Sequence, residues 1–232
     1  MLGILMHGLN GGVASLSPFG PETGQHLPMQ SHTEPTEIAR HRIDALSDGV
    51  YAIAITLLVL ELKLPALAEG SSEAALRAAL LALTPKILMW LLSFWVMAIF
   101  WLAQQRQNRY ALGLDRLSLN IELAQLALVS LLPFSTALIG EHGDLPSAAA
   151  VYAANLLGLA LLGFARVVHL ARTPALQAEH LTPELQKALL WRSAAVAALC
   201  VAAFGLAFVV PGWNMLALLP LILVRSHGPA RA

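Results

Sequence analysis

Charged residues are scarce in this chain of 232 residues. Lys, Arg, Asp and Glu make up 12% of it, and the 14 basic and 14 acidic residues cancel to a formal net charge of zero. A soluble domain typically carries about 25% charged residues, so the composition argues against one. Without a basic excess we expect no nucleic-acid partner. The 57% of hydrophobic residues instead indicates a membrane protein whose main surroundings are the lipid bilayer.

Cysteine and the common catalytic motifs are also missing. Cys200 is the single cysteine, which excludes an intrachain disulfide. The chain has no H-E-x-x-H, G-x-S-x-G or P-loop pattern. Its eight histidines lie at the ends of apolar runs or in the N-terminal region, away from the serines inside those runs. We therefore expect no enzymatic activity and no cofactor.

Long uncharged runs dominate the rest of the chain. Residues 87–105, 123–140 and 145–165 are runs of 19, 18 and 21 residues, and residues 193–224 form a run of 32 around Pro211-Gly212. A transmembrane helix needs about 20 apolar residues, whereas outer-membrane strands alternate over about ten. The runs therefore predict an all-α, polytopic membrane protein with six transmembrane helices. We place these helices at residues 38–63, 84–105, 117–140, 147–171, 186–210 and 213–226.

The distribution of basic residues predicts the orientation. With six spans, eleven of the 14 basic residues lie on the side of the two termini, and only Lys63, Arg77 and Lys86 lie on the other. Cytoplasmic loops carry an excess of Lys and Arg, so both termini are predicted to be cytoplasmic. Residues 1–36 have no Lys or Arg and many Gly and Pro, which predicts a disordered tail. Residues 37–228 then form the six-helix membrane domain.

The first predicted helix has a short apolar run with ionisable residues on both sides. Its uncharged part, residues 49–60, is too short for a lipid-facing span. Ionisable residues at the membrane boundary usually face a bundle interior or a water-filled path. At helical spacing one apolar stripe lies within about 40° of Ile53, with Thr56 beside it. The stripe consists of Gly49, Ile53, Leu57, Leu60 and Leu64. Taken alone, it is typical of an ordinary packing face.

Three segments resemble the transmembrane protein 175 family of potassium-permeable channels, which occurs in bacteria, archaea and animal endosomes and lysosomes. "RIDALSD" at residues 42–48 resembles the family's R-x-x-x-F-S-D signature. "SFWVMAIFW" at residues 93–101 resembles its second helix, and "LLPFSTALIG" at residues 131–140 its third. Leu46 replaces the signature Phe, and "AQQRQ" follows Trp101 where many relatives carry histidines.

The resemblance implies a homotetramer in a prokaryotic inner membrane, with the first helix of each subunit lining a central pore. It implies that Ile53 forms the narrowest apolar ring, that Leu57 and Leu60 form the next rings outward, and that Thr56 supplies a hydroxyl layer. The signature residues would lie at the cytoplasmic mouth, where we expect a structural clamp. They are Arg42, Leu46, Ser47 and Asp48. Potassium would pass transiently, without a fixed metal site.

Selectivity is expected to be weak, because no T-V-G-Y-G carbonyl filter occurs in the chain. The alternative function is a proton-coupled secondary transporter in which Asp48 or Glu122 carries the proton. Transporters commonly have inverted repeats and broken helices near the bilayer midplane. The continuous predicted helices favour the channel.

Overall fold

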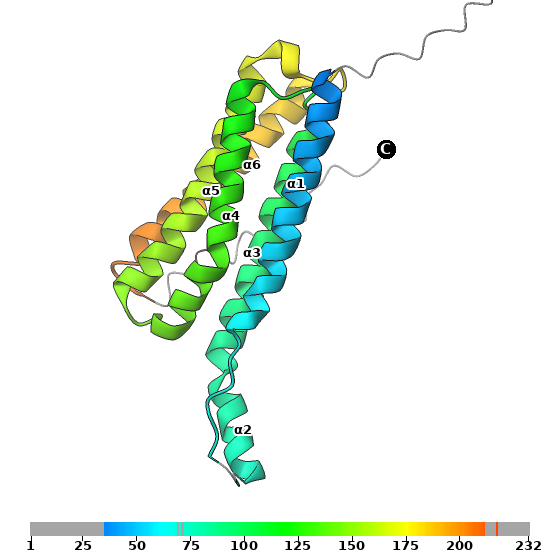
Figure 1. Ribbon diagram of the computed structural model, residues 1–232. Coiled ribbons are helices and arrows are strands. Elements are labelled where there is room, and N and C mark those ends of the chain that lie inside the picture. Colours follow the sequence, from blue (N-terminus) through cyan, green and yellow to red (C-terminus); the bar gives the residue numbers. More distant parts are fainter. Residues whose placement is uncertain (1–34, 69, 71, 212–216, 218–232) are drawn as a thin grey trace, which may run out of the picture. The chain divides into compact units, whose positions relative to one another are not determined.

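A computed structural model describes residues 35–68, 70, 72–211 and 217 of the chain. Within these residues the regular structure is helical, as predicted, apart from one isolated bridge between Ala111 and Gln177 (Figure 1). The elements are α1 (Pro35–Leu57), the 3₁₀ turn η1 (Leu58–Glu61), α2 (Glu73–Ala82), α3 (Thr84–Arg109), α4 (Arg116–His142), α5 (Pro146–Arg172), the 3₁₀ turn η2 (Pro174–Leu176) and α6 (Pro183–Leu206).

Five helical segments in the described part of the chain are long and apolar enough to span a membrane. They are α1 with η1, then α3, α4, α5 and α6, and they correspond to the first five predicted spans. The predicted sixth span, residues 213–226, lies outside the described residues except for residue 217. The all-α membrane fold is therefore confirmed, while the count of six spans stays a prediction.

Several helix boundaries differ from the predicted ones. The α-helix of the first span ends at Leu57 and continues as the tighter turn η1 through Glu61, so the predicted end at residue 63 was too late. The same helix begins at Pro35, inside the predicted tail; residues 1–34 of that tail lie outside the described residues. Helix α2 was missed, because it lies in a segment that was interpreted as an external link.

Local sequence signals account for the starts of three helices. The side chains of Ser72, Asp115 and Thr182 accept hydrogen bonds from backbone N–H groups three residues further on, at 3.2, 2.8 and 3.3 Å. Such N-caps satisfy donors that the first helical turn leaves without partners. Thr182 is followed by Pro183, whose missing N–H costs nothing at a helix start.

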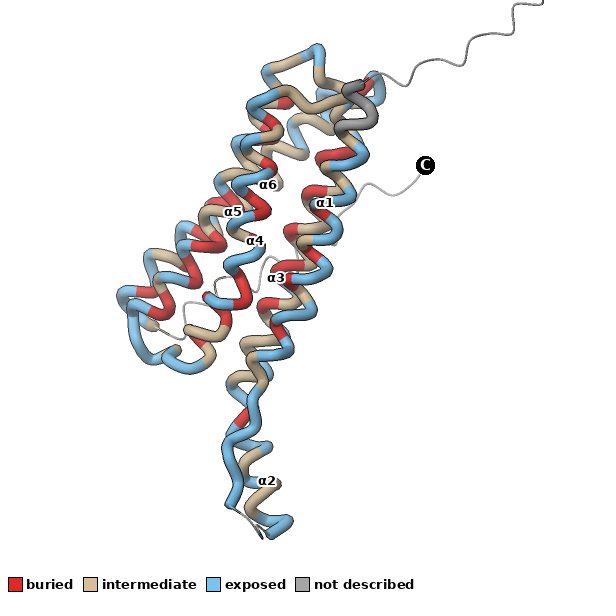
Figure 2. The backbone as a smooth tube through the Cα atoms, in the orientation of Figure 1, coloured by how far each residue is buried: buried red, intermediate tan, exposed pale blue. Residues whose placement is uncertain are grey.

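Buried residues line the inner faces of the helices (Figure 2). Helix α5 packs against both α4 and α6, and α1 packs against α4 and α3. At Gly158 of α5 an added Cβ would lie 2.8 Å from a methyl carbon of Leu128 on α4, so a larger residue there would displace that side chain. The packing therefore places α1 at one side of the bundle, where its other face is not covered by the helices of the described residues.

Candidate functional site

Helix α1 buries one narrow face against the rest of its subunit. Ser47, Tyr51, Ala54 and Leu58 follow each other at steps of four, three and four residues, and each is almost completely buried. This spacing keeps the four side chains on one side of a helix. They pack against α3 and α4, so this face determines how α1 is attached to the subunit.

The predicted apolar stripe lies on the opposite, exposed face of the same segment. Ile53, Leu57 and Leu60 are 61%, 41% and 62% exposed within the single chain. The change to a 3₁₀ turn after Leu57 keeps Leu60 in line, because residues three apart eclipse each other in that geometry. Near Gly49 an added Cβ would meet nothing within 4 Å. The apolar stripe is therefore left uncovered by the part of the chain that the structure describes.

Thr56 is exposed beside this stripe. Its hydroxyl donates a hydrogen bond of 2.8 Å to the backbone carbonyl oxygen of Ile53. A hydroxyl has one proton and two lone pairs, so this bond uses the proton and leaves the lone pairs on the oxygen. The Thr56 oxygen can therefore accept a hydrogen bond from water, or contact a cation, while its hydroxyl proton stays bonded to the Ile53 carbonyl oxygen.

Two residues of the signature tether α1 to its neighbours. The Ser47 hydroxyl donates to Glu122 Oε1 on α4 at 2.8 Å and accepts from Gln104 Nε2 on α3 at 3.2 Å. Asp48 Oδ1 accepts from Trp101 Nε1 at 2.8 Å and from Gln105 Nε2 at 2.6 Å. Neighbouring residues of the motif thus hold α1 through two separate groups of hydrogen bonds.

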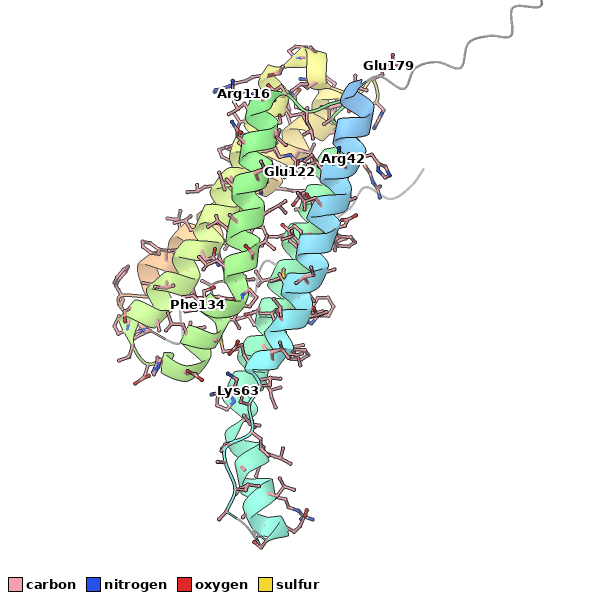
Figure 3. The ribbon with its side chains drawn as sticks, in the orientation of Figure 1. Arg42, Lys63, Arg116, Glu122, Phe134 and Glu179 are labelled. Atoms are coloured by element: carbon pink, nitrogen blue, oxygen red, sulfur yellow. The ribbon has the colours of Figure 1, made fainter. Side chains whose placement is uncertain are left out.

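The other two signature residues are placed differently. Arg42 and Leu46 are both exposed, and Arg42 forms no hydrogen bond or ion pair with another described residue. Figure 3 shows Arg42 at the end of the bundle that also carries Arg116, whereas Lys63 lies toward the opposite end. The predicted clamp therefore has contacts at Ser47 and Asp48, but none at Arg42 within this part of the chain.

A buried ion pair lies directly behind the Ser47 contact. Glu122 is 0% exposed, and its Oε2 lies 3.7 Å from Arg166 Nη1, while Gln104 donates to its Oε1 at 3.0 Å. Arg166 also donates to the side-chain oxygen of Asn108. Removing one partner of such a pair leaves an uncompensated charge, which typically costs about 3–5 kcal/mol. Glu122 thus connects α4 to α1, α3 and α5 through its carboxylate.

Sequence reasoning missed several members of this network. Arg166 was counted only among the basic residues on the side of the two termini, whereas its side chain is buried on α5. Asn108 Nδ2 donates to Asp44 Oδ1 at 2.7 Å, and Arg40 reaches the Asn108 backbone carbonyl. The sequence offered one signal: Arg166 and Glu122 each border a long apolar run, and charged side chains at membrane depth usually pair, but the sequence does not say with which partner.

Outside the spans, Asp115 caps α4 at the same end of the bundle. Hydrogen bonding from Ser118 lowers the pKa of the Asp115 carboxyl to about 2, and the neighbouring His169 adds to this effect. His169 Nε2 lies 2.8 Å from Asp115 Oδ2. This contact joins the start of α4 to the end of α5.

A second polar group lies deeper in the bundle and consists of uncharged side chains. The hydroxyls of Ser93 and Tyr152 are 3.0 Å apart, and Thr136 donates to Ser93 at 3.0 Å. Asn155 donates to Ser135 at 3.1 Å. These contacts join α3, α4 and α5 where lipid could not satisfy the groups. The described residues contain no group of three or more His, Cys, Asp or Glu side chains that could hold a metal ion.

The chain resembles known proteins over most of its described helices. A sequence model of the family described as the endosomal/lysosomal potassium channel TMEM175 matches residues 42–133, from the signature Arg42 to Pro133. The crystal structure of a TMEM175 homologue from Chamaesiphon minutus superposes with a TM-score of 0.69 at 31% identity. The match covers 81% of this chain and 96% of that one. The chain belongs to the TMEM175 family.

Named relatives of this TMEM175-family chain agree with that assignment. It is 37% identical over 136 residues to a protein of Streptomyces collinus named as a potassium channel, and 37% identical over 131 residues to one of Chamaesiphon minutus. These matches cover 57% and 55% of this chain, and they span 65% and 64% of the relatives' own length. The alternative of a proton-coupled transporter acting through Asp48 or Glu122 finds no support among these relatives.

Proposed function

We propose that this TMEM175-family protein is a potassium-permeable, weakly selective cation channel in which four copies place their α1 helices around a central pore. The observation that supports it best is the division of α1 into two faces. One face is held by Ser47, Tyr51 and Leu58, and the other leaves Ile53 and Leu60 exposed. A tetramer that turns the exposed stripe inward would surround its axis with apolar side chains.

The narrowest point of this pore is the proposed ring of Ile53 side chains. Hydrophobic constrictions of this kind gate by losing water, because apolar walls offer water no hydrogen bonds. Leu57 and Leu60 would continue the apolar neck outward, one turn at a time. An ion crosses the neck only when the ring widens or when the ion sheds part of its hydration shell. Potassium holds its water less tightly than sodium, so the neck favours potassium.

Selectivity in this pore must come from side chains. The carbonyl groups of α1 are engaged in helical hydrogen bonds, so α1 cannot present a ring of free carbonyl oxygens like that of a classical potassium filter. The Thr56 hydroxyl, with its proton bound to the Ile53 carbonyl, offers its oxygen lone pairs next to the neck. One hydroxyl layer replaces little of a hydration shell. The proposed channel therefore discriminates weakly between potassium and sodium.

The signature residues act on the pore through the position of α1. Ser47 and Asp48 would set its tilt through their bonds to α3 and α4, while Arg42 and Leu46 would face the cytoplasmic mouth. Asp48→Ala removes both acceptor contacts and is expected to reduce tetramer yield before it alters selectivity. Arg42→Ala is the matched comparison and is expected to assemble normally. A normal Asp48→Ala tetramer with an altered potassium-to-sodium ratio would place Asp48 in the ion path instead.

The chain is a multi-pass membrane protein of a family with bacterial channels, and we propose the inner membrane with both termini cytoplasmic. Reporter fusions at Ala232 and within the link at residues 66–72 should report opposite sides of the membrane. The same side for both would exclude the six-span arrangement. We propose neither an enzymatic activity nor a cofactor for the protein.

The function is tested with purified protein in liposomes. The mass of the detergent-solubilised particle, measured by light scattering, should be that of four chains, because a monomer has no central pore. Reconstituted protein should carry potassium down its gradient without a proton gradient. A monomeric particle, or flux that requires a proton gradient, would contradict the channel.

A further inference from the structure

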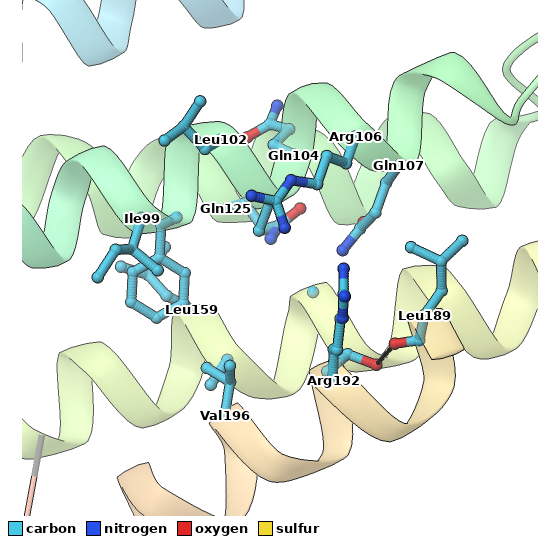
Figure 4. Close-up of a pocket in the computed structure, with 15 residues that line it drawn as sticks. Ile99, Leu102, Gln104, Arg106, Gln107, Gln125, Leu159, Leu189, Arg192 and Val196 are labelled. Carbon is cyan, nitrogen blue, oxygen red and sulfur yellow. Dashed lines mark hydrogen bonds between the residues drawn. The ribbon is translucent and has the colours of Figure 1, made fainter. Parts of the chain in front are cut away.

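A cavity of about 100 Å³ lies between α3, α4, α5 and α6, away from the exposed stripe of α1. Figure 4 shows that its two ends differ in character. Ile99, Leu159 and Val196 gather at one end, and Arg106, Gln107, Gln125 and Arg192 gather at the other. The cavity therefore joins an apolar wall to a polar, positively charged end within one subunit.

The polar end suits an anion. Arg106 on α3 and Arg192 on α6 reach into it from opposite sides (Figure 4). Guanidinium groups present several N–H donors in a planar fork that matches phosphate geometry. Two arginines and two amide side chains thus converge at one end of the cavity, where they can surround a phosphodiester group.

Gln125 places an acceptor oxygen at the cavity that needs a hydrogen-bond donor, which an anion without a proton cannot supply. Gln125 is only 5% exposed, it lines the cavity, and its Oε1 has no hydrogen-bond partner among the described residues. A buried acceptor without a partner typically costs about 1–3 kcal/mol, so a ligand that donates a hydrogen bond here is favoured. The occupant should carry a hydroxyl or another donor beside its negative charge.

The position in the fold also fits a lipid headgroup. Arg106 lies one turn before the end of α3, and Arg192 lies in the first half of α6, which starts at the same end of the bundle. In the proposed orientation this end is cytoplasmic. Basic pockets between transmembrane helices on that side are suited to anionic lipid headgroups.

We propose that this cavity binds the headgroup of an anionic, hydroxyl-bearing phospholipid such as phosphatidylglycerol. Its phosphate lies between Arg106 and Arg192, its headgroup hydroxyl donates to Gln125, and an acyl chain follows the wall formed by Ile99 and Val196. Such a lipid would link α3 to α6, which otherwise packs mainly against α5. None of the lining residues belongs to α1, although one of them, Gln104, also donates a hydrogen bond to Ser47 of α1.

The experiment is native mass spectrometry and thermal melting of the delipidated full-length protein. Phosphatidylglycerol should bind and raise the melting temperature more than phosphatidylcholine or inorganic phosphate does. Each arginine near an anionic lipid surface contributes about fivefold in affinity, so Arg106→Gln and Arg192→Gln should each weaken binding about fivefold and the double variant roughly 25-fold. Arg116→Gln removes an exposed charge at the same end outside the cavity and should bind like the parent.

Four results would overturn the proposal. If phosphatidylcholine binds as well as phosphatidylglycerol, the site does not select a negatively charged headgroup. If inorganic phosphate raises the melting temperature as much as phosphatidylglycerol does, the cavity is a site for free anions. Unchanged lipid binding by a correctly assembled double variant would place the lipid elsewhere. In a Cys200→Ala background, a disulfide between Val196→Cys and Leu221→Cys would show that the chain's own predicted sixth span fills the cavity. If the double variant fails to assemble, Gln125→Leu provides the second test: it should lose the preference for phosphatidylglycerol over phosphatidic acid, which lacks the headgroup hydroxyls.

Discussion

Replacing Ile53 by Asn tests the proposed pore most directly. Within a single subunit the side chain is 61% exposed, so the change removes little packing, and exposed substitutions typically alter stability by no more than about 0.5 kcal/mol. In the tetramer it would place four amide groups at the narrowest ring. Polar groups let water enter the constriction and give the ion oxygen atoms to contact.

The size of the effect follows from the cost of passing a polar species through an apolar ring. An uncompensated polar group in an apolar site costs about 1–3 kcal/mol in proteins. If the amides recover about 1–2 kcal/mol of that cost, potassium flux rises roughly 5- to 30-fold. Sodium gains more than potassium, because a wetter and wider neck demands less dehydration. Flux is measured in liposomes with potassium-loaded and sodium-loaded interiors.

The control is Val201→Asn on α6, which removes a similarly exposed apolar side chain (53%) from a helix that packs mainly against α5. This variant should conduct like the parent. If Ile53→Asn forms normal tetramers and also conducts like the parent, Ile53 does not lie on the ion path, and the stripe is a packing face.

Three further predictions concern the surroundings of the pore. Thr56→Ala leaves the width of the neck unchanged but removes its hydroxyl oxygen, so the potassium-to-sodium permeability ratio should fall with less gain in flux; bi-ionic reversal potentials measure this. Glu122→Ala leaves Arg166 buried without its carboxylate and should cost about 3–5 kcal/mol, seen as a lower melting temperature and tetramer yield; an unchanged melting temperature would mean that the pair contributes nothing. Asp115→Ala should lower the melting temperature at pH 7. The pKa of Asp115 falls from 3.8 to about 2 on folding, so the stabilisation by its carboxylate is complete above about pH 4 and is lost toward pH 2. The difference in melting temperature between parent and variant should therefore shrink between about pH 4 and about pH 2. A difference that stays constant would contradict the assigned hydrogen bonds.

The membrane class and the first five spans could be predicted from the sequence because both depend on local properties. The length of an apolar run has to match the bilayer, and no tertiary contact changes that requirement. The stripe of Ile53, Leu57 and Leu60 could be grouped for the same reason, since helical spacing alone places them on one side. Helical spacing could not tell a pore-lining face from a packing face. The signature motif indicated the family, and the family gave a reason to consider a pore.

Which neighbour each polar side chain meets depended on the folded chain. Gln104 and Gln105 are adjacent and chemically identical, yet one bonds to Ser47 and Glu122 and the other to Asp48. Helical periodicity turns them about 100° apart but does not say which helix lies in either direction. That information comes from the packing of α1 against α3 and α4.

The pairing of Glu122 with Arg166 was likewise beyond the reach of sequence reasoning, because the two residues are far apart in the chain and meet only where α4 and α5 pack together. The cavity between Arg106 and Arg192 depends on four helices at once. Local rules operate over one or two helical turns, whereas these contacts are set by how whole helices pack. The sequence alone therefore determined the spans and the stripe, and the tertiary structure decided which side chains support them.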